Sequence, residues 1–298
     1  MSFQAVLTGW FLRYKFKRAT RGTLNVQNAR LMVNKMAERN PPVPKSVSHQ
    51  PVPAQNNLCP AEWLKADQPK LTVLYFHGGG YFFCGLDTHR PVCAYLAKSA
   101  QAQVLSVDYR LAPEHVFPAA IDDGVAWWKA LLDQGIDPSQ VVFGGDSAGG
   151  GLTLAVLIAA RDQGLPMPAG AVLFSPWTDL SCSGESMRSQ AKADVMFEPP
   201  ALPQAAQFYL AGRPATTPLA SPLFADLKGL PPLMIHASEH EVLRDDSTRL
   251  HAKAQQQGVQ SELHLKPKMP HVWPTMVLLP EARDSLKQTV AFMHRVTR

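Results

Sequence analysis

Cysteine is scarce in this sequence of 298 residues, which contains only four: Cys59, Cys84, Cys93 and Cys182. No two of them form a Cys-x-x-Cys pair, and no cysteines and histidines have the spacing of a zinc site. We therefore interpret them as reduced thiols, mostly buried in the packing of a cytoplasmic protein, and expect no metal.

Long apolar runs and blocks of like charge are also missing. No apolar run approaches the roughly 18 residues of a membrane-spanning helix, so stable membrane insertion is not expected. The net charge is +5 and the pI is near 9.0, but the body of the chain has no cluster of basic residues. Nucleic acid is therefore not expected as a partner. The sequence contains no internal repeat.

The N-terminal segment combines apolar and basic residues. Apolar residues recur there at helical spacing, at Phe3, Val6, Leu7, Trp10, Phe11 and Tyr14. Basic residues follow at Lys15, Lys17, Arg18 and Arg21. A secretory signal has the opposite order, with its charges before the apolar run. We interpret the segment as a helix packed on the body of the protein; a helix lying in a membrane interface is the alternative.

From residue 71 onward, short apolar runs alternate with helical patterns. The apolar runs span 71–77, 103–109, 141–147, 169–176, 231–238 and 261–267, and suit strands buried on both faces of a parallel sheet. Helical patterns lie at roughly 89–100, 118–134, 148–163, 247–257 and 281–296. Proline-rich residues 40–70 predict extended edge strands. The alternation predicts one α/β unit over residues 1–298, with helices on both faces of a mostly parallel sheet.

Residues 181–217 interrupt this alternation because they contain no convincing strand. So long a connection inside a compact domain is usually functional. We predict a helical cap built from about 1–45 and about 181–217. The catalytic core is then about 46–180 and 218–298.

The stretch VVFGGDSAGGGLTLAV places one serine among five glycines, between a predicted strand and a predicted helix. Gly145 to Gly149 fit Gly-x-Ser-x-Gly, the pattern of a nucleophile elbow, although the glycines alone could also form an ordinary tight turn. A serine nucleophile needs a base, an orienting acid and an oxyanion hole. The rest of the chain can be searched for these parts.

Three glycines at the end of an earlier strand are candidates for the oxyanion hole. Gly78, Gly79 and Gly80 follow His77, and their lack of side chains would let backbone N–H groups approach a developing oxyanion. The N–H of Ala148, after the serine, is the usual second donor. His77 more plausibly holds this loop by hydrogen bonding than acts as a base.

The base and acid are sought in the order serine, acid, histidine. His271 follows a strand and precedes the last helix, whereas its rival His240 comes before the acid candidates. Glu241 lies three residues after a strand end, where the acid is expected. Asp245 is the second candidate, but Asp245 and Asp246 also look like the capped start of a helix.

The sequence resembles the hormone-sensitive-lipase-like family of bacterial esterases from about residue 71 to the C-terminus. HGGGYFFCG, YRLAPEHVFPA, GDSAGGG and MPHVW carry the resemblance. It implies an α/β-hydrolase fold with a helical cap, no cofactor, and hydrolysis of short to medium acyl esters. It maps the nucleophile to Ser147, the histidine to His271 and the oxyanion glycines to Gly78 and Gly79. The family's acid is commonly aspartate, whereas this chain has Glu241.

These observations predict a serine carboxylesterase that acts on small acyl esters through Ser147, His271 and Glu241. One alternative is a catalytically silent ligand-binding protein on the same fold. A second alternative is a hydrolase with the same catalytic residues that cleaves a lactone, amide or thioester. A third is a lipase for long acyl chains whose N-terminal helix lies on a membrane. A homodimer is left open.

Overall fold

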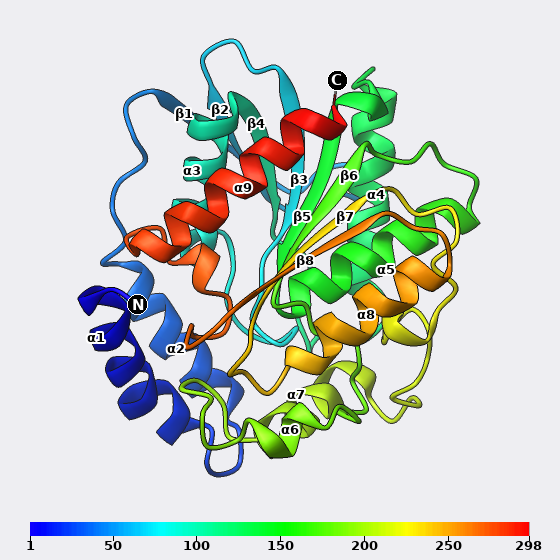
Figure 1. Ribbon diagram of the computed structural model, residues 1–298. Helices are drawn as coiled ribbons and strands as arrows, with labels where there is room; N and C mark the ends of the chain where they lie inside the picture. Colours follow the sequence, from blue (N-terminus) through cyan, green and yellow to red (C-terminus); the bar gives the residue numbers. More distant parts are fainter. Residues whose placement is uncertain (298) are drawn as a thin grey trace.

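The computed structural model describes residues 1–297, and its centre is an eight-stranded sheet in the order β1-β2-β4-β3-β5-β6-β7-β8 (Figure 1). The strands are β1 (Val47–Val52), β2 (Ala61–Ala66), β3 (Leu71–Phe76), β4 (Ala102–Val107), β5 (Val141–Asp146), β6 (Gly170–Phe174), β7 (Leu233–Ser238) and β8 (Ser261–Lys266). β2 pairs antiparallel with β1 and β4, and every other pairing is parallel. The proline-rich segment supplies the predicted extended strands at this edge of the sheet, and they pair antiparallel.

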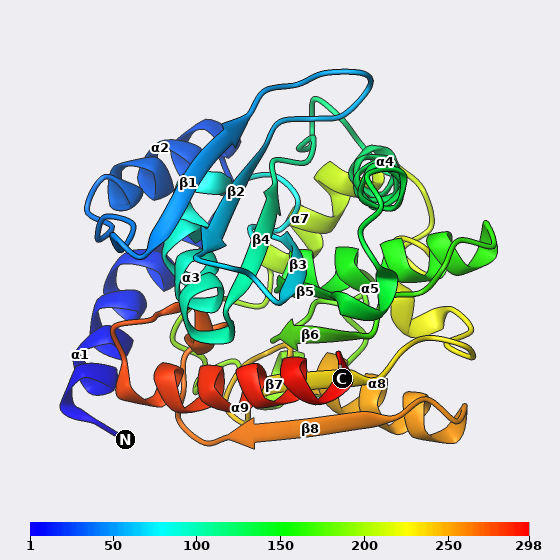
Figure 2. The same ribbon diagram turned by 90° about the horizontal axis from the view of Figure 1, so that it is seen from above.

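Helices cover both faces of the sheet (Figure 2). Strands β3, β5 and β7 are buried at every residue, which is what continuous apolar runs produce in a parallel sheet. On one face lie α3 (Leu86–Ala100) and α9 (Pro280–Val296); on the other lie α4 (Ala119–Asp133), α5 (Ala148–Asp162) and α8 (Arg244–Gln256). Short helical turns occur at η2 (Pro138–Gln140), η3 (Pro222–Phe224) and η4 (Trp273–Thr275). The predicted α/β class is confirmed.

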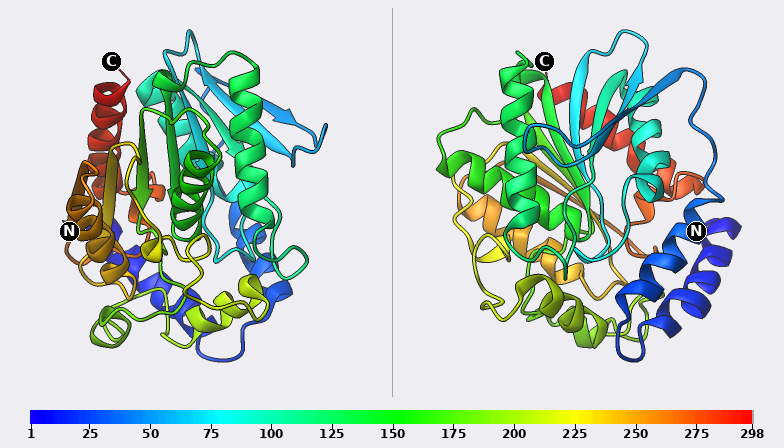
Figure 3. Two further views of the ribbon diagram at one scale, coloured as in Figure 1. Left: turned by 90° about the vertical axis from the view of Figure 1, so that its right-hand side faces the viewer. Right: turned by 180° about the vertical axis from the view of Figure 1, so that it is seen from behind.

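Two segments far apart in the sequence meet beyond the carboxyl ends of the parallel strands (Figures 1 and 3). The first holds α1 (Phe3–Leu12), the π-helix η1 (Arg13–Lys17) and α2 (Val26–Ala37); the second holds α6 (Ser186–Ser189) and α7 (Ala201–Leu210). The N–H of Glu198 donates to Thr20 Oγ1 at 3.0 Å, and the N–H of Leu24 donates to Gln204 Oε1 at 2.9 Å. Polar bonds therefore join the two segments.

Helix α1 forms where the sequence predicts it, and only part of its apolar surface is buried. Ala5 and Leu12 are buried, whereas most of the apolar stripe that suggested packing on the body is exposed. The exposed residues are Phe3, Leu7, Trp10, Phe11 and Tyr14. The helix does pack on the body of the protein, as expected, but through Ala5 and Leu12 and not through its largest apolar residues. Across residues 1–297, every helix is too short or too polar to reach through a bilayer.

Candidate active site

Ser147 lies in the sharp turn between β5 and α5, with φ 51° and ψ −122°. Its N–H donates to the carbonyl of Phe174 at 2.8 Å. The turn demands small neighbours: a Cβ on Gly149 would lie 2.1 Å from the carbonyl oxygen of Phe76, and one on Gly145 would lie 2.3 Å from the carbonyl oxygen of Gly149. The glycines thus let helix and strand approach closely behind Ser147, which is buried and lines the cavity; this is the geometry of a nucleophile elbow.

His271 and Glu241 come together at the carboxyl edge of the sheet, from the loops after β8 and β7. Nδ1 of His271 is hydrogen bonded to one carboxylate oxygen of Glu241, and the other oxygen accepts the Ser238 N–H at 2.8 Å. Both side chains are almost fully buried. The ionised carboxylate of Glu241 can only accept a hydrogen bond, so Nδ1 of His271 must carry the proton. In this neutral tautomer Nε2 has no proton and is a hydrogen-bond acceptor.

Charge around His271 favours its protonated form. Burial by itself lowers the pKa of an imidazole, but the charge of Glu241 and its hydrogen bond, helped by Asp194 and Asp146, raise the pKa of His271 above its ordinary value of 6.5. The imidazolium that forms when His271 accepts a proton is therefore stabilised by its surroundings.

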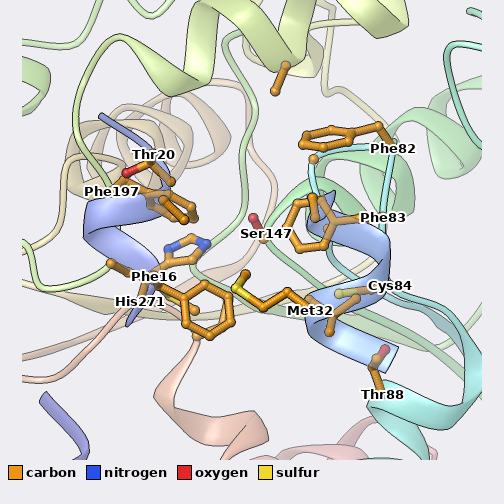
Figure 4. A pocket seen from close by; sticks show the side chains of 18 of the residues that line it. Phe16, Thr20, Met32, Phe82, Phe83, Cys84, Thr88, Ser147, Phe197 and His271 are labelled. Carbon is orange, nitrogen blue, oxygen red and sulfur yellow. The ribbon is translucent and has the colours of Figure 1, made fainter. Parts of the chain in front are cut away.

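The imidazole of His271 and the hydroxyl of Ser147 lie next to each other in the wall of the same cavity (Figure 4). Within residues 1–297, Nε2 of His271 is buried and has no hydrogen-bond partner. The rival residues are engaged elsewhere: Asp245 accepts the Ser186 N–H at 2.8 Å, and His240 accepts the Lys268 N–H at 3.1 Å. Nε2 of His271 is therefore free to accept the proton of the Ser147 hydroxyl.

The predicted oxyanion glycines divide into two roles. The N–H of Gly78 donates to the carboxylate of Asp146 at 3.1 Å, so it is not free for a substrate. Gly79 and Gly80 line the cavity and have positive φ, of 111° and 57°. Assigning Gly78 to the oxyanion hole is therefore corrected: Gly79, Gly80 and the N–H of Ala148 remain the candidate donors. His77 holds this loop through Nδ1 and the Gly78 carbonyl at 2.7 Å, as expected.

A buried carboxylate next to the serine, Asp146, was not among the predicted site residues. Asp146 accepts from Tyr75 Oη at 2.8 Å and pairs with His89 Nε2 at 3.2 Å, besides holding Gly78. Burial opposes ionisation, but His89 and the Tyr75 hydrogen bond keep the pKa of Asp146 below its ordinary value. Asp146 thus ties the glycine loop to the elbow. The position of Asp146 directly before Ser147 is the feature of the sequence that could have indicated this role.

A second missed carboxylate, Asp194, links the 181–217 segment to the acid loop. Its oxygens accept N–H groups from Met196 at 2.6 Å, Phe197 at 2.9 Å and Val242 at 2.9 Å. The ring of Phe197 packs edge-on against His271 at 5.0 Å. No sequence pattern marks Asp194, because its partners lie in a connection of irregular structure and in a distant turn.

The cavity above Ser147 has a volume of about 540 Å³ and a mostly apolar wall. Side chains from the N-terminal segment (Phe16, Met32) and from the glycine loop (Phe82, Phe83) line it, with Phe197 beside His271 (Figure 4). Among residues 1–297, no group of three or more His, Cys, Asp or Glu side chains could hold a metal ion. The arrangement can bind a small apolar ligand and present it to a hydroxyl, an imidazole and backbone N–H groups.

Comparisons with known proteins show which family the chain resembles. A family model described as the alpha/beta hydrolase fold matches residues 73–275. An acetyl-hydrolase of Streptomyces hygroscopicus is 42% identical over 241 residues, which cover 80% of this chain and 81% of the relative. The carboxylesterase NlhH of Mycobacterium tuberculosis is 38% identical over 237 residues, covering 75% and 73%.

Solved structures are similar over the whole chain. A crystal structure of EstE5 soaked with p-nitrophenyl butyrate superposes with a TM-score of 0.92 at 41% identity, covering 100% of this chain and 99% of that chain. An esterase from the bacterial hormone-sensitive lipase family superposes with a TM-score of 0.93 at 36% identity, again covering 100% and 99%. The resemblance seen in the motifs therefore extends to the fold.

Proposed function

The chain belongs to the α/β-hydrolase superfamily, among the hormone-sensitive-lipase-like esterases, and is a carboxylic ester hydrolase; we propose that it works through a Ser147–His271–Glu241 triad and an acyl-enzyme. The observation that carries the proposal is the buried imidazole of His271, held at Nδ1 by Glu241 with Nε2 free on the side of Ser147. This is the arrangement that converts a weak hydroxyl into a nucleophile.

In the proposed first step, Nε2 of His271 takes the proton of Ser147 as its Oγ attacks the ester carbonyl carbon. The carbonyl oxygen becomes an oxyanion, which the N–H groups of Gly79, Gly80 and Ala148 stabilise. Glu241 holds the imidazole and stabilises its positive charge without taking the proton. His271 then gives the proton to the departing alcohol, leaving Ser147 acylated.

In the second step, His271 removes a proton from water, which attacks the acyl-enzyme carbonyl through the same oxyanion site. Collapse of this intermediate returns the proton to Ser147 and releases the acid. The sequence of steps needs no group beyond those of the chain and one water.

We further propose that residues 1–45 and 181–217 form a cap that sets the range of acyl chains. Phe16 and Met32 from the first segment and Phe197 from the second line the same cavity. A volume of about 540 Å³ lies in the range typical of small-molecule sites and suits short to medium acyl chains.

The test is a series of p-nitrophenyl esters from acetyl to palmitoyl, assayed with the wild type, Ser147→Ala and His271→Ala. We expect highest kcat/KM on short to medium chains and a loss of about 10³-fold or more in each variant. His240→Ala is the matched control and should keep wild-type activity. A wild type inert on every ester, or a Ser147→Ala variant that retains activity, would overturn the proposal.

A further inference from the structure

Helix α1 has two apolar sides that face in opposite directions. Ala5 packs in a cluster with Trp273 and Leu279, and Leu12 packs with Phe16 of η1. The other side is turned away from the protein: Phe3 is 74% exposed, Trp10 is 77% exposed and Tyr14 is 62% exposed. Together with Leu7 and Phe11 they follow helical spacing. Tyr14 lies just beyond α1, in η1, and the five side chains form one stripe, which we call the outer stripe of α1.

An exposed row of large apolar side chains is costly unless something covers it. In Figures 1 and 2, α1 lies at the margin of the molecule, and no other element lies outside it. Packing in the protein therefore explains Ala5 and Leu12 but does not explain the outer stripe.

The charge of the N-terminal segment indicates the kind of surface that the outer stripe contacts. Residues 1–37 contain seven of the 29 Lys and Arg residues and none of the 24 Asp and Glu residues. The remaining residues carry 22 basic against 24 acidic side chains, so the whole positive net charge resides in this segment. Lys15 and Arg18 are exposed beside the stripe, with their charged groups 5.5 and 5.2 Å from the ring centre of Tyr14.

We propose that the outer stripe of α1 docks the protein on an anionic phospholipid surface. Aromatic and aliphatic side chains would enter the boundary between headgroups and acyl chains, while Lys15 and Arg18 pair with lipid phosphates. An aromatic stripe flanked by cations and free of carboxylates is the pattern of a helix that lies in a membrane interface.

Docking would also place the cavity beside the lipid. Leu12 and Phe16, on the packed side of the same segment, line the cavity above Ser147. Docking would then hold the cavity one helical segment away from esters dissolved in the lipid. This second step rests on the proposed esterase function, whereas the docking itself does not.

The experiment measures binding of the full chain to phosphatidylglycerol vesicles and to phosphatidylcholine vesicles by flotation, at low and high salt. Trp10 is a built-in reporter, because Trp63 is half-buried and Trp127, Trp128, Trp177 and Trp273 are buried. We expect binding to the anionic vesicles only, weakened by salt, with a blue shift of tryptophan emission that Trp10→Ser abolishes.

Two variants separate the apolar and the charged contribution. Trp10→Ser should weaken binding about tenfold, whereas Phe224→Ser, at an exposed apolar residue distant from α1 in sequence, should not. Lys15→Gln/Arg18→Gln should weaken binding about 25-fold, at roughly fivefold per charge, whereas Lys129→Gln/Lys228→Gln should not. All four should hydrolyse p-nitrophenyl acetate in solution like the wild type, since none of these residues lines the cavity.

Wild-type protein that fails to float with anionic vesicles at low salt would overturn the proposal. So would equal binding to both lipids, or binding that the α1 variants leave unchanged. A second copy as the true occupant would appear as a dimer in sedimentation that Trp10→Ser dissociates, and would also overturn it. Ser147→Ala should still dock, so loss of esterase activity and loss of docking are distinguishable.

Discussion

Glu241 divides its two carboxylate oxygens between the His271 imidazole and the backbone N–H of Ser238. The hydrogen bond from Ser238 holds the Glu241 carboxylate in place, and the carboxylate in turn holds the orientation of the His271 imidazole. The turn after β7 therefore accommodates the longer side chain of a glutamate and still brings its carboxylate to the imidazole.

Glu241→Gln tests this role. An amide can donate to Nδ1 and so stabilise the wrong imidazole tautomer, which should lower kcat by about 10³- to 10⁴-fold while KM changes little. Asp245→Asn is the matched control, because Asp245 bonds to Ser186 and not to the histidine. Steady-state kinetics on p-nitrophenyl butyrate check both. Near-wild-type activity of Glu241→Gln would contradict the acid assignment.

The pH profile tests the charges around His271. The base must be neutral, so activity is lost as pH falls through the pKa of His271, which Glu241 and the more distant Asp194 raise. The acid limb of kcat/KM should therefore lie above pH 6.5. Asp194→Asn removes one negative charge and should move this limb to lower pH, whereas the exposed Asp133→Asn should not. A limb that stays in place in Asp194→Asn would argue against the coupling.

Single residues differ in how far the sequence reveals them. Ser147, His271 and Glu241 could be predicted because each follows a strand and the three occur in a recognisable order. The hydrogen bond between Gly78 and Asp146 could not, because it joins the loop after β3 to the end of β5, 68 residues further along the chain. The contacts of Asp194 are equally non-local.

At the scale of elements, the approach of α5 to β3 controls the elbow. A Cβ at Gly149 would lie 2.1 Å from the carbonyl oxygen of Phe76, an atom of the backbone that cannot rotate away. Close contact of this kind is a property of the packed elements and not of the serine alone.

Gly149→Ala should therefore destabilise the fold by about 1–3 kcal/mol or more and lower activity further by displacing Ser147. Gly22→Ala is the control, because a Cβ there meets nothing within 4 Å. Thermal unfolding and kinetics measured on the same samples check the pair. Equal melting temperatures for both variants would contradict the packing account.

The π-helix η1 supplies a second link between elements. Lys17 is buried and its Nζ donates to the carbonyl oxygens of Ala191 at 2.5 Å and Asp194 at 2.7 Å. Strands and long helices could be predicted from periodicity, but η1 could not, because one wide turn leaves no pattern in five residues.

At the scale of the whole molecule, the N-terminal segment is a wall of the cavity as well as an outer surface. Deletion of residues 1–20 removes Leu12, Phe16 and the Lys17 link together. Activity should fall even on p-nitrophenyl acetate, because the cavity opens to water. A circular dichroism spectrum and a melting curve should show that the core stays folded. Unchanged activity on this ester would contradict the proposed cap.

The α/β class could be predicted from alternating strands and helices, and the motifs pointed to the family. The orientation of α1 could not be predicted, because a helix that is apolar on both sides gives the same periodic signal whichever side packs. Only the arrangement around Ala5 and Leu12 decides which stripe is left outside.

The most direct test of the central claim, an acyl-enzyme on Ser147, is covalent labelling with a fluorophosphonate that reacts with activated serines. Intact-protein mass spectrometry and peptide mapping would follow the label. We expect one adduct per chain, located on Ser147, and none in Ser147→Ala; His271→Ala should label far more slowly. An unlabelled wild type, or a label on another residue, would contradict the account.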